Sequence, residues 1–124
     1  MKKIILSVLM AAMSTGAMAE WVGYAESKTT AFYLDPATIR KDDNFRKVWS
    51  VQDLKQRHKN GEMSLRLLQE FDCKEDRFRI LSYSKHSGPM VSGEILGSQS
   101  SPSKWEYIPP ETISNTLLEI VCRQ

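Results

Sequence analysis

Cysteine and histidine are scarce in this sequence, with only two of each among its 124 residues. Zinc sites are built mostly from Cys and His ligands at short, regular spacings, and no such spacing is present. The P-loop, the glycine pattern of dinucleotide-binding folds and the G-x-S-x-G motif of hydrolases are also missing. The sequence therefore predicts a protein that is not an enzyme and that needs no metal ion or cofactor.

The two histidines, His58 and His86, both lie in polar segments that are typical of turns. A Ser-His-Asp triad needs a histidine beside a nucleophile and an acid, and no motif places either histidine next to such partners. We therefore expect both histidines to be solvated loop residues.

Beyond the N-terminal region the sequence has no long apolar run. No segment there has the ~20 apolar residues that a membrane-spanning helix needs. At the N-terminus, Lys2 and Lys3 precede an apolar run over residues 4–13 and an A-x-A cleavage site that ends at Ala19. This order is typical of a secretory signal peptide. The alternative is a membrane anchor, but polar residues interrupt the run too early for one.

The predicted cleavage divides the chain into a signal peptide, residues 1–19, and a single domain, residues 20–124. Glu20 follows the cleavage site where a lipoprotein would have cysteine, so no lipoprotein anchor is expected. We therefore expect an exported protein that is periplasmic or secreted, with the cell surface as a further destination.

The charge of the chain is balanced once the signal peptide is removed. The full sequence has 17 Lys and Arg against 15 Asp and Glu, and Lys2 and Lys3 belong to the signal peptide, so 15 of each sign remain. A neutral domain has no general attraction to nucleic acid or anionic membranes. Residues 40–59 nevertheless hold seven basic and three acidic residues, which predicts a local basic patch.

The two cysteines, Cys73 and Cys122, are expected to form a disulfide, because exported chains fold in oxidising compartments. A metal-binding pair is the alternative, but no further Cys or His lies near either residue. Closing a loop of about 50 residues would destabilise the unfolded chain by roughly 4 kcal/mol.

The clearest β-strand pattern runs from Ser64 to Cys73, where Leu65, Leu67 and Phe71 share one face with the cysteine. This alternation directs Cys73 towards the core. Segments of similar character predict about six strands, at residues 21–25, 29–34, 45–54, 64–73, 77–84 and 90–96.

Two of these strands have irregular patterns. In residues 45–54, Trp49 and Val51 share one face, and Val48 lies on an otherwise polar face that we expect not to be fully solvated. In residues 77–84 the apolar face changes at Ile80 and Leu81, which indicates a β-bulge or a strand covered on both sides.

The C-terminal part of the chain divides into three segments with different sequence patterns. Residues 97–104 have the composition of a surface loop, and residues 105–108 either pair briefly or fill the core. From Glu111 to Arg123 the apolar residues follow helical spacing, with Cys122 at the edge of the apolar arc. Strands followed by one helix predict an α+β fold, in which the helix packs across an antiparallel sheet.

Basic side chains are the candidate contacts for a partner, in particular Arg77 and Arg79, which alternate along one strand face. They could bind an acidic partner, or they could pair with Glu70 and Asp72 on the neighbouring strand, which we favour. The candidate partner-binding residues are Arg46, Lys47, Arg66, Lys74, Arg77 and Arg79.

Five segments together resemble the surface-adhesin protein E family. They are Tyr33-Leu34-Asp35-Pro36-Ala37-Thr38-Ile39, Val48-Trp49-Ser50-Val51, Glu70-Phe71-Asp72-Cys73, Arg79-Ile80-Leu81-Ser82-Tyr83 and Trp105-Glu106-Tyr107-Ile108-Pro109-Pro110. No single segment is specific, but their order and spacing, with the late Cys122, extend the resemblance over almost the whole predicted domain.

The resemblance implies an antiparallel sheet of about six strands with a C-terminal helix held by a disulfide. It also implies a non-enzymatic, adhesin-like domain of the bacterial envelope that binds a protein partner, such as a host matrix or serum protein. The alternative is a soluble periplasmic housekeeping protein that binds a small ligand or an envelope partner. A homodimer formed through sheet edges is a further expectation.

Overall fold

The computed structural model describes residues 19–123, so the predicted signal peptide lies outside the described residues except for Ala19. The strands are β1 (Val22–Glu26), β2 (Thr30–Leu34), β3 (Arg40–Asp42), β4 (Phe45–Leu54), β5 (Ser64–Asp72), β6 (Arg77–His86), β7 (Ile95–Gln99) and β8 (Glu106–Tyr107). The helices are the 3-10 turns η1 (Pro36–Thr38) and η2 (Pro89–Val91) and the α-helix α1 (Ile113–Cys122).

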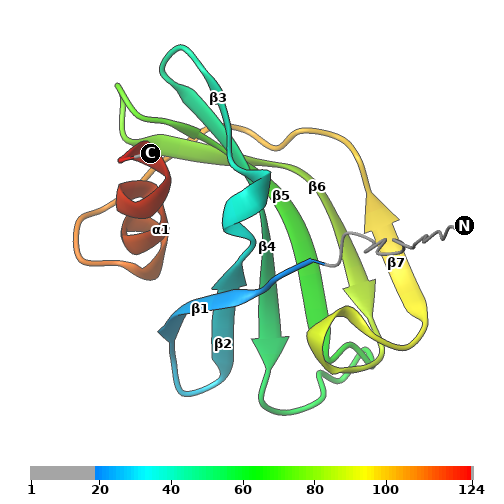
Figure 1. The fold of residues 1–124 in the computed structure, drawn as a ribbon. Helices are drawn as coiled ribbons and strands as arrows, with labels where there is room; N and C mark the ends of the chain where they lie inside the picture. Colours follow the sequence, from blue (N-terminus) through cyan, green and yellow to red (C-terminus); the bar gives the residue numbers. More distant parts are fainter. Residues whose placement is uncertain (1–18, 124) are drawn as a thin grey trace, which may run out of the picture.

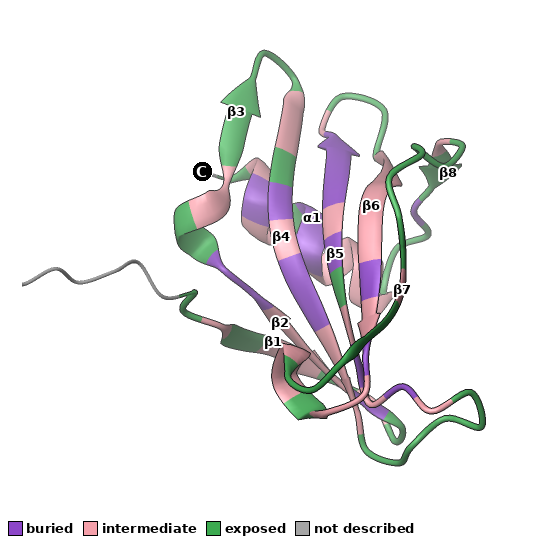
Figure 2. Ribbon diagram, turned by 90° about the vertical axis from the view of Figure 1, so that its right-hand side faces the viewer, coloured by how far each residue is buried: buried purple, intermediate pink, exposed green. Residues whose placement is uncertain are grey.

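The strands form one antiparallel sheet in the order β1-β2-β4-β5-β6-β7. β3 pairs with the first part of β4, and β8 pairs with the first part of β6. α1 packs on one face of this sheet, behind β4 and β5 in Figure 2 (Figures 1 and 2). The predicted α+β architecture is therefore confirmed, with two short strands in addition to the six of the main path.

The hydrophobic core lies between α1 and the sheet face beneath it, which we call the inner face. Its fully or almost fully buried side chains are Leu34, Val48, Phe71, Ile108, Leu117, Leu118 and Val121. Burial of one such side chain stabilises the fold by about 1.5–3 kcal/mol. The alternation predicted for β5 is correct, since Phe71 belongs to this core.

The inner side of β4 differs from its predicted polar character. Val48 is fully buried in the core, and Ser50 on the same side is also buried. The Ser50 hydroxyl donates a 2.6 Å hydrogen bond to Oε1 of Gln69 on β5, which satisfies both groups. The expectation that this side is not fully solvated is therefore correct, although the side belongs to the core. Trp49 lies on the opposite face of the sheet.

A β-bulge in β6 explains why its apolar pattern changes sides. Leu68 on β5 lies opposite Ser82, whereas the next residue, Gln69, lies opposite Ile80. Leu81 is therefore an extra residue on β6, and the side chains before and after it have opposite phase. Of the two alternatives predicted for this strand, a β-bulge or a strand covered on both sides, the structure shows the bulge at Ile80–Leu81.

The helix α1 begins two residues later than the sequence pattern suggested. Thr112 is the N-cap, and its Oγ1 accepts a hydrogen bond from the backbone N–H of Asn115 at 3.1 Å. Glu111 precedes the helix with a φ of 64°, so it does not belong to the first helical turn. The buried face of α1 is as predicted, with Leu117 and Val121 in the core.

The predicted disulfide between Cys73 and Cys122 is confirmed, with an Sγ–Sγ distance of 2.00 Å and Cα atoms 5.8 Å apart. Cys73 directly follows β5, and Cys122 is the last residue of α1. The bond therefore ties the end of the helix to the end of β5, one of the inner strands of the sheet.

The strand predicted at residues 90–96 is wrong for most of its length. Residues 89–91 form η2, and β7 begins only at Ile95 and continues into the predicted loop as far as Gln99. Two side chains hold η2 against the sheet: the backbone N–H of Met90 donates to Asp53, and that of Val91 donates to Ser64, each at 2.8 Å. Both predicted alternatives for residues 105–108 are found, because β8 pairs with β6 and Ile108 enters the core.

Candidate functional site

The sheet face opposite α1 carries a row of arginine and tryptophan side chains, which we call the arginine–tryptophan face. Arg66 alternates with the inner-face residue Leu67 on β5, so it points away from the helix. Arg77 and Arg79 on β6 lie on the same side, because they are paired across the strands with Asp72 and Glu70. The face is defined by Trp49, Arg66, Arg77, Arg79 and Trp105.

Each arginine of this face stacks over an indole ring. The guanidinium carbons of Arg77 and Arg79 lie 4.7 and 4.5 Å from the ring centre of Trp105, and that of Arg66 lies 4.9 Å from the ring centre of Trp49. Such contacts contribute about 0.5–1 kcal/mol each at exposed sites. Trp105 also packs against Phe45 with ring centres 5.9 Å apart, so a residue from an irregular segment joins β4 to β6.

Arg77 and Arg79 also form ion pairs with β5, as the favoured alternative predicted. Arg77 Nε donates to Asp72 Oδ2 at 2.9 Å, and Arg79 donates to Glu70 Oε1 at 2.9 Å. The carboxylates are buried, whereas the arginine side chains remain 29% and 31% exposed. The face is therefore not a bare positive strip, because Arg77 and Arg79 each have a carboxylate partner on β5.

Asp72 is held in its charged form although it is buried. Burial alone would raise its pKa, but hydrogen bonds from Arg77 and from the backbone N–H groups of Glu75 and Lys74, together with the positive charge of Arg77, lower it below the ordinary value. The Asp72 Oδ1 atom accepts both backbone bonds, at 3.1 and 3.2 Å. Asp72 therefore orients Arg77 and at the same time closes the turn after β5.

The remaining candidate partner-binding residues are placed differently. Lys47 on β4 is exposed and lies opposite Glu70 in the strand register, on the arginine–tryptophan face. Lys74 is exposed in the turn between β5 and β6. Arg46 points to the inner side, where its guanidinium donates to the carbonyl oxygens of Asp43 and Phe45. The structure thus places Lys47, Arg66, Arg77 and Arg79 on one face of the sheet and Arg46 on the other.

Trp105 is the residue of this face that sequence reasoning did not single out. The chain around it is rich in serine and has no periodic pattern, so nothing local indicates which side chains it contacts. The only available signal was the presence of a tryptophan beside a loop of small polar residues. Large aromatic side chains in such segments are usually anchored against the fold or against a partner.

His86 is buried, which corrects the prediction of a solvated loop residue. It is the last residue of β6 and only 4% exposed, because β6 extends further than the sequence indicated. Its Nε2 lies 2.7 Å from the Ser84 hydroxyl, while its buried Nδ1 has no hydrogen-bond partner among residues 19–123. Burial and the positive charge of Arg66 lower the pKa of His86. The Ser84–His86 pair has no third group that would orient the imidazole, as a hydrolytic triad requires.

His58 is an exposed loop residue, as predicted, with Nδ1 at 3.6 Å from Glu62 Oε2.

Across residues 19–123 no three His, Cys, Asp or Glu side chains are grouped so that they could hold a metal ion. Over the same residues no helix has the length and apolar character needed to cross a membrane.

A single antiparallel sheet, one helix packed across it and a disulfide between the two define a small disulfide-bonded α+β domain. The chain belongs to the Surface-adhesin protein E family, whose sequence profile matches residues 21–123. The resemblance seen in the sequence is thereby confirmed.

Solved structures of protein E from Haemophilus influenzae share this fold. One crystal form superposes with a TM-score of 0.69 at 13% sequence identity, covering 94% of this chain and 97% of that chain. The protein from a non-typeable strain superposes with a TM-score of 0.66 at 15% identity, covering 91% of this chain and 82% of that chain. No curated protein sequence is significantly similar to this chain.

Proposed function

We propose that this chain is an exported, non-enzymatic domain that binds a protein, in the manner of a bacterial surface adhesin that contacts host matrix or serum proteins. The observation that carries the proposal is the arginine–tryptophan face, which α1 leaves uncovered. Membership of the surface-adhesin protein E family supports it.

The side chains of this face are those that dominate protein–protein interfaces. Tryptophan, tyrosine and arginine are enriched among the residues whose truncation weakens binding most. Tyr107 lies beside Arg77 in the strand register and is 70% exposed, so it extends the face towards solvent. Because the arginines are already held by ion pairs and indole rings, ordering them on binding costs less entropy.

The cellular location can be tested independently of binding. A surface adhesin must be accessible to protease added to intact cells, whereas a periplasmic protein is digested only after the outer membrane is opened. Accessibility on intact cells is the expected result. Protection in intact cells would favour the alternative of a soluble periplasmic protein with an envelope partner.

Binding is tested with the processed chain and a panel of immobilised matrix and serum proteins. The variant Lys47→Gln/Arg66→Gln/Lys74→Gln removes three exposed charges of this region without breaking the ion pairs of Arg77 and Arg79. We expect about tenfold weaker binding of any partner that uses this face, the equivalent of about 1.4 kcal/mol. Surface plasmon resonance would measure the loss, with Lys28→Gln/Lys41→Gln/Lys59→Gln as a matched control.

Equal loss of binding in both triple variants would indicate a general charge effect and would argue against a specific face. A second variant, Trp105→Ala, removes the indole ring that Arg77 and Arg79 share. Unchanged binding in both this variant and the first triple variant would place the contact elsewhere.

A further inference from the structure

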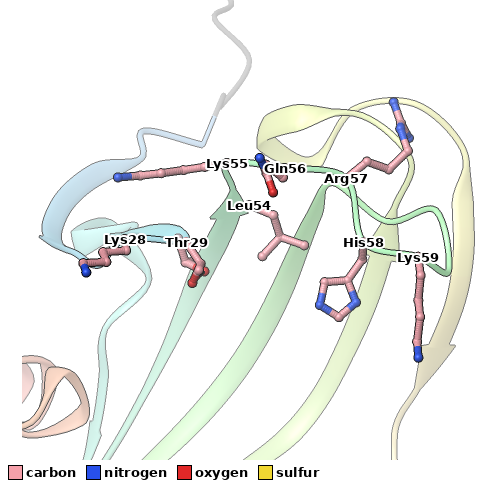
Figure 3. A pocket seen from close by; sticks show the side chains of 9 residues that line it. Lys28, Thr29, Leu54, Lys55, Gln56, Arg57, His58 and Lys59 are labelled. Carbon is pink, nitrogen blue, oxygen red and sulfur yellow. Dashed lines mark hydrogen bonds between the residues drawn. The ribbon is translucent and has the colours of Figure 1, made fainter.

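A second surface feature lies at the far end of the sheet from α1, at the turn after β4. A pocket of about 750 Å³ opens there between the β1–β2 turn and the β4–β5 connection (Figure 3). This volume is within the range of small-molecule sites. The pocket is lined by Lys28, Thr29, Thr30, Leu54, Lys55, Gln56, Arg57, His58 and Lys59.

The lining contains five basic side chains and no carboxylate. Lys55 pairs with Glu26 outside the lining, and His58 lies near Glu62. Among the described residues, Lys28 and Lys59 form no ion pair. We call the part of the site formed by Lys28, His58 and Lys59 the basic rim.

Arg57 differs from the other basic residues of the lining. Its guanidinium donates to the carbonyl oxygens of Gly61 and Ser87 at 2.9 and 2.8 Å. In Figure 3 it extends away from His58 and Lys59, which project to the opposite side of the connection. Arg57 therefore braces the loop, and the basic rim presents its charges to the pocket.

The pocket continues into an apolar surface on the inner face of the sheet. Leu54 is half-buried and extends to the same side as His58 and Lys59 (Figure 3). The strand register places Phe32 and Leu65 on either side of Gln52 of β4, on the same side as Leu54. Both are half-buried and lie outside the core cluster that α1 covers. A partly exposed strip of Leu54, Phe32 and Leu65, with Gln52 as its polar member, thus leads from the basic rim towards the helix; we call it the apolar strip.

We propose that this pocket binds an anionic amphiphile with a carboxylate or phosphate head and a single apolar chain. The basic rim would hold the head by charge-assisted hydrogen bonds, which are about twice as strong as neutral ones. The chain would lie on the apolar strip. The site is on the other side of the sheet from the arginine–tryptophan face, so it does not depend on the protein-binding proposal.

The test is isothermal titration calorimetry on the processed chain, with probes below their micelle concentrations. Dodecanoate and dodecyl phosphate carry the proposed head groups, dodecyltrimethylammonium carries the opposite charge, and inorganic phosphate lacks the chain. We expect both anionic amphiphiles to bind at least about tenfold more tightly than the other two probes. Competition between the two anions would show that they share one site.

Variants locate the binding within the chain. Lys28→Gln/Lys59→Gln should weaken the anionic amphiphiles about tenfold, because two charged hydrogen-bond donors are lost. Lys47→Gln/Lys74→Gln, on the other face, is the matched control and should leave binding unchanged. Leu54→Asn should weaken dodecanoate while leaving the thermal melting of the protein close to that of the parent.

Several results would overturn the proposal. One is equal binding of the cationic amphiphile, which would indicate non-specific adsorption to apolar surface. Another is binding of inorganic phosphate as tightly as dodecyl phosphate, which would indicate a simple anion site. Failure of both anions to bind, or identical binding by parent and Lys28→Gln/Lys59→Gln, would also exclude it, whatever the outcome of the matrix-protein experiment.

Discussion

His86 is a residue whose environment couples the stability of the domain to pH. It is buried at the end of β6, and its pKa is lowered from the ordinary value of 6.5 by burial and by the charge of Arg66. A group whose pKa is lower in the folded state binds fewer protons there than in the unfolded chain. Its contribution to stability is therefore present above pH 6.5 and is lost as the pH falls through the folded-state value.

We expect His86→Gln to reduce this pH dependence. Urea unfolding at pH values on either side of 6.5 would measure the free energy of unfolding of parent and variant. The parent should lose more stability than the variant on acidification. Lys59→Gln, a substitution of an exposed residue that is not a histidine, is the control and should keep the parent's slope. Equal slopes in parent and His86→Gln would contradict the assignment.

Individual residues also show how far alternation along a strand can be used for prediction. The pairing of Arg77 and Arg79 with Asp72 and Glu70 was predictable because neighbouring strands of a hairpin are close in sequence and their register follows from the turn. The stacking of both arginines on Trp105 was not predictable, since it depends on a loop with no periodic pattern.

At the scale of elements, the short helix α1 depends on its contacts with the sheet. It has ten residues, and isolated helices shorter than about 12–15 residues are marginal in water. Its apolar face is held against the core by Leu117 and Val121, and its last residue is bonded to the end of β5. The disulfide therefore restrains the element that closes the core.

Reduction of the Cys73–Cys122 bond should destabilise the domain by about 4 kcal/mol in the chain-entropy account of loop closure. Thermal melting with and without reductant, followed by circular dichroism, would measure the change. Cys73→Ala/Cys122→Ala is the control. It should melt at a lower temperature than the parent, and reductant should not change its melting temperature. A melting temperature that reductant leaves unchanged in the parent would contradict a stabilising role.

The strand β7 shows why some elements were misplaced. Residues 90–96 have strand-like composition, but Met90 and Val91 adopt φ values of 50° and 64° and are held by hydrogen bonds from their backbone N–H groups to Asp53 and Ser64. These acceptors lie on two other strands. No local pattern reports such contacts, so composition alone placed the strand too early.

At the scale of the whole molecule, the main path of the sheet ends at β1 on one side and at β7 on the other. β7 exposes Ile95 and Leu96, which are 64% and 44% accessible. An exposed apolar edge strand is a template for pairing with another chain. We therefore still predict a homodimer, and we expect its interface to be the β7 edge with Ile95 and Leu96.

Sedimentation velocity of the processed chain would test this. We expect a dimer, and we expect Ile95→Lys/Leu96→Lys to shift it to monomer, because two like charges would meet across the pairing. Val22→Lys at the β1 edge is the control and should leave the dimer intact. A parent chain that sediments as a monomer at high concentration would exclude the dimer.

The two proposed sites lie on opposite faces of the sheet. The arginine–tryptophan face interleaves positive charges with carboxylates, whereas the basic rim presents Lys28, His58 and Lys59 without a carboxylate in the pocket lining. The basic residues predicted to form one patch in residues 40–59 thus lie in different places. Lys47 is on the arginine–tryptophan face, whereas Lys55, Arg57 and Lys59 line the pocket. Net charge alone could not indicate either site.

The sequence by itself determined most of the architecture, because strand alternation, the change of apolar face at Ile80 and Leu81, the helical spacing between Glu111 and Arg123 and the two cysteines are local or pairwise signals. The tertiary structure alone decided that the Val48 side of β4 is core, that His86 is buried and that Trp105 joins the arginines. It also brought the β1–β2 turn next to the β4–β5 connection to form the pocket. These features arise from contacts between residues far apart in the chain, and no periodicity within one segment encodes them.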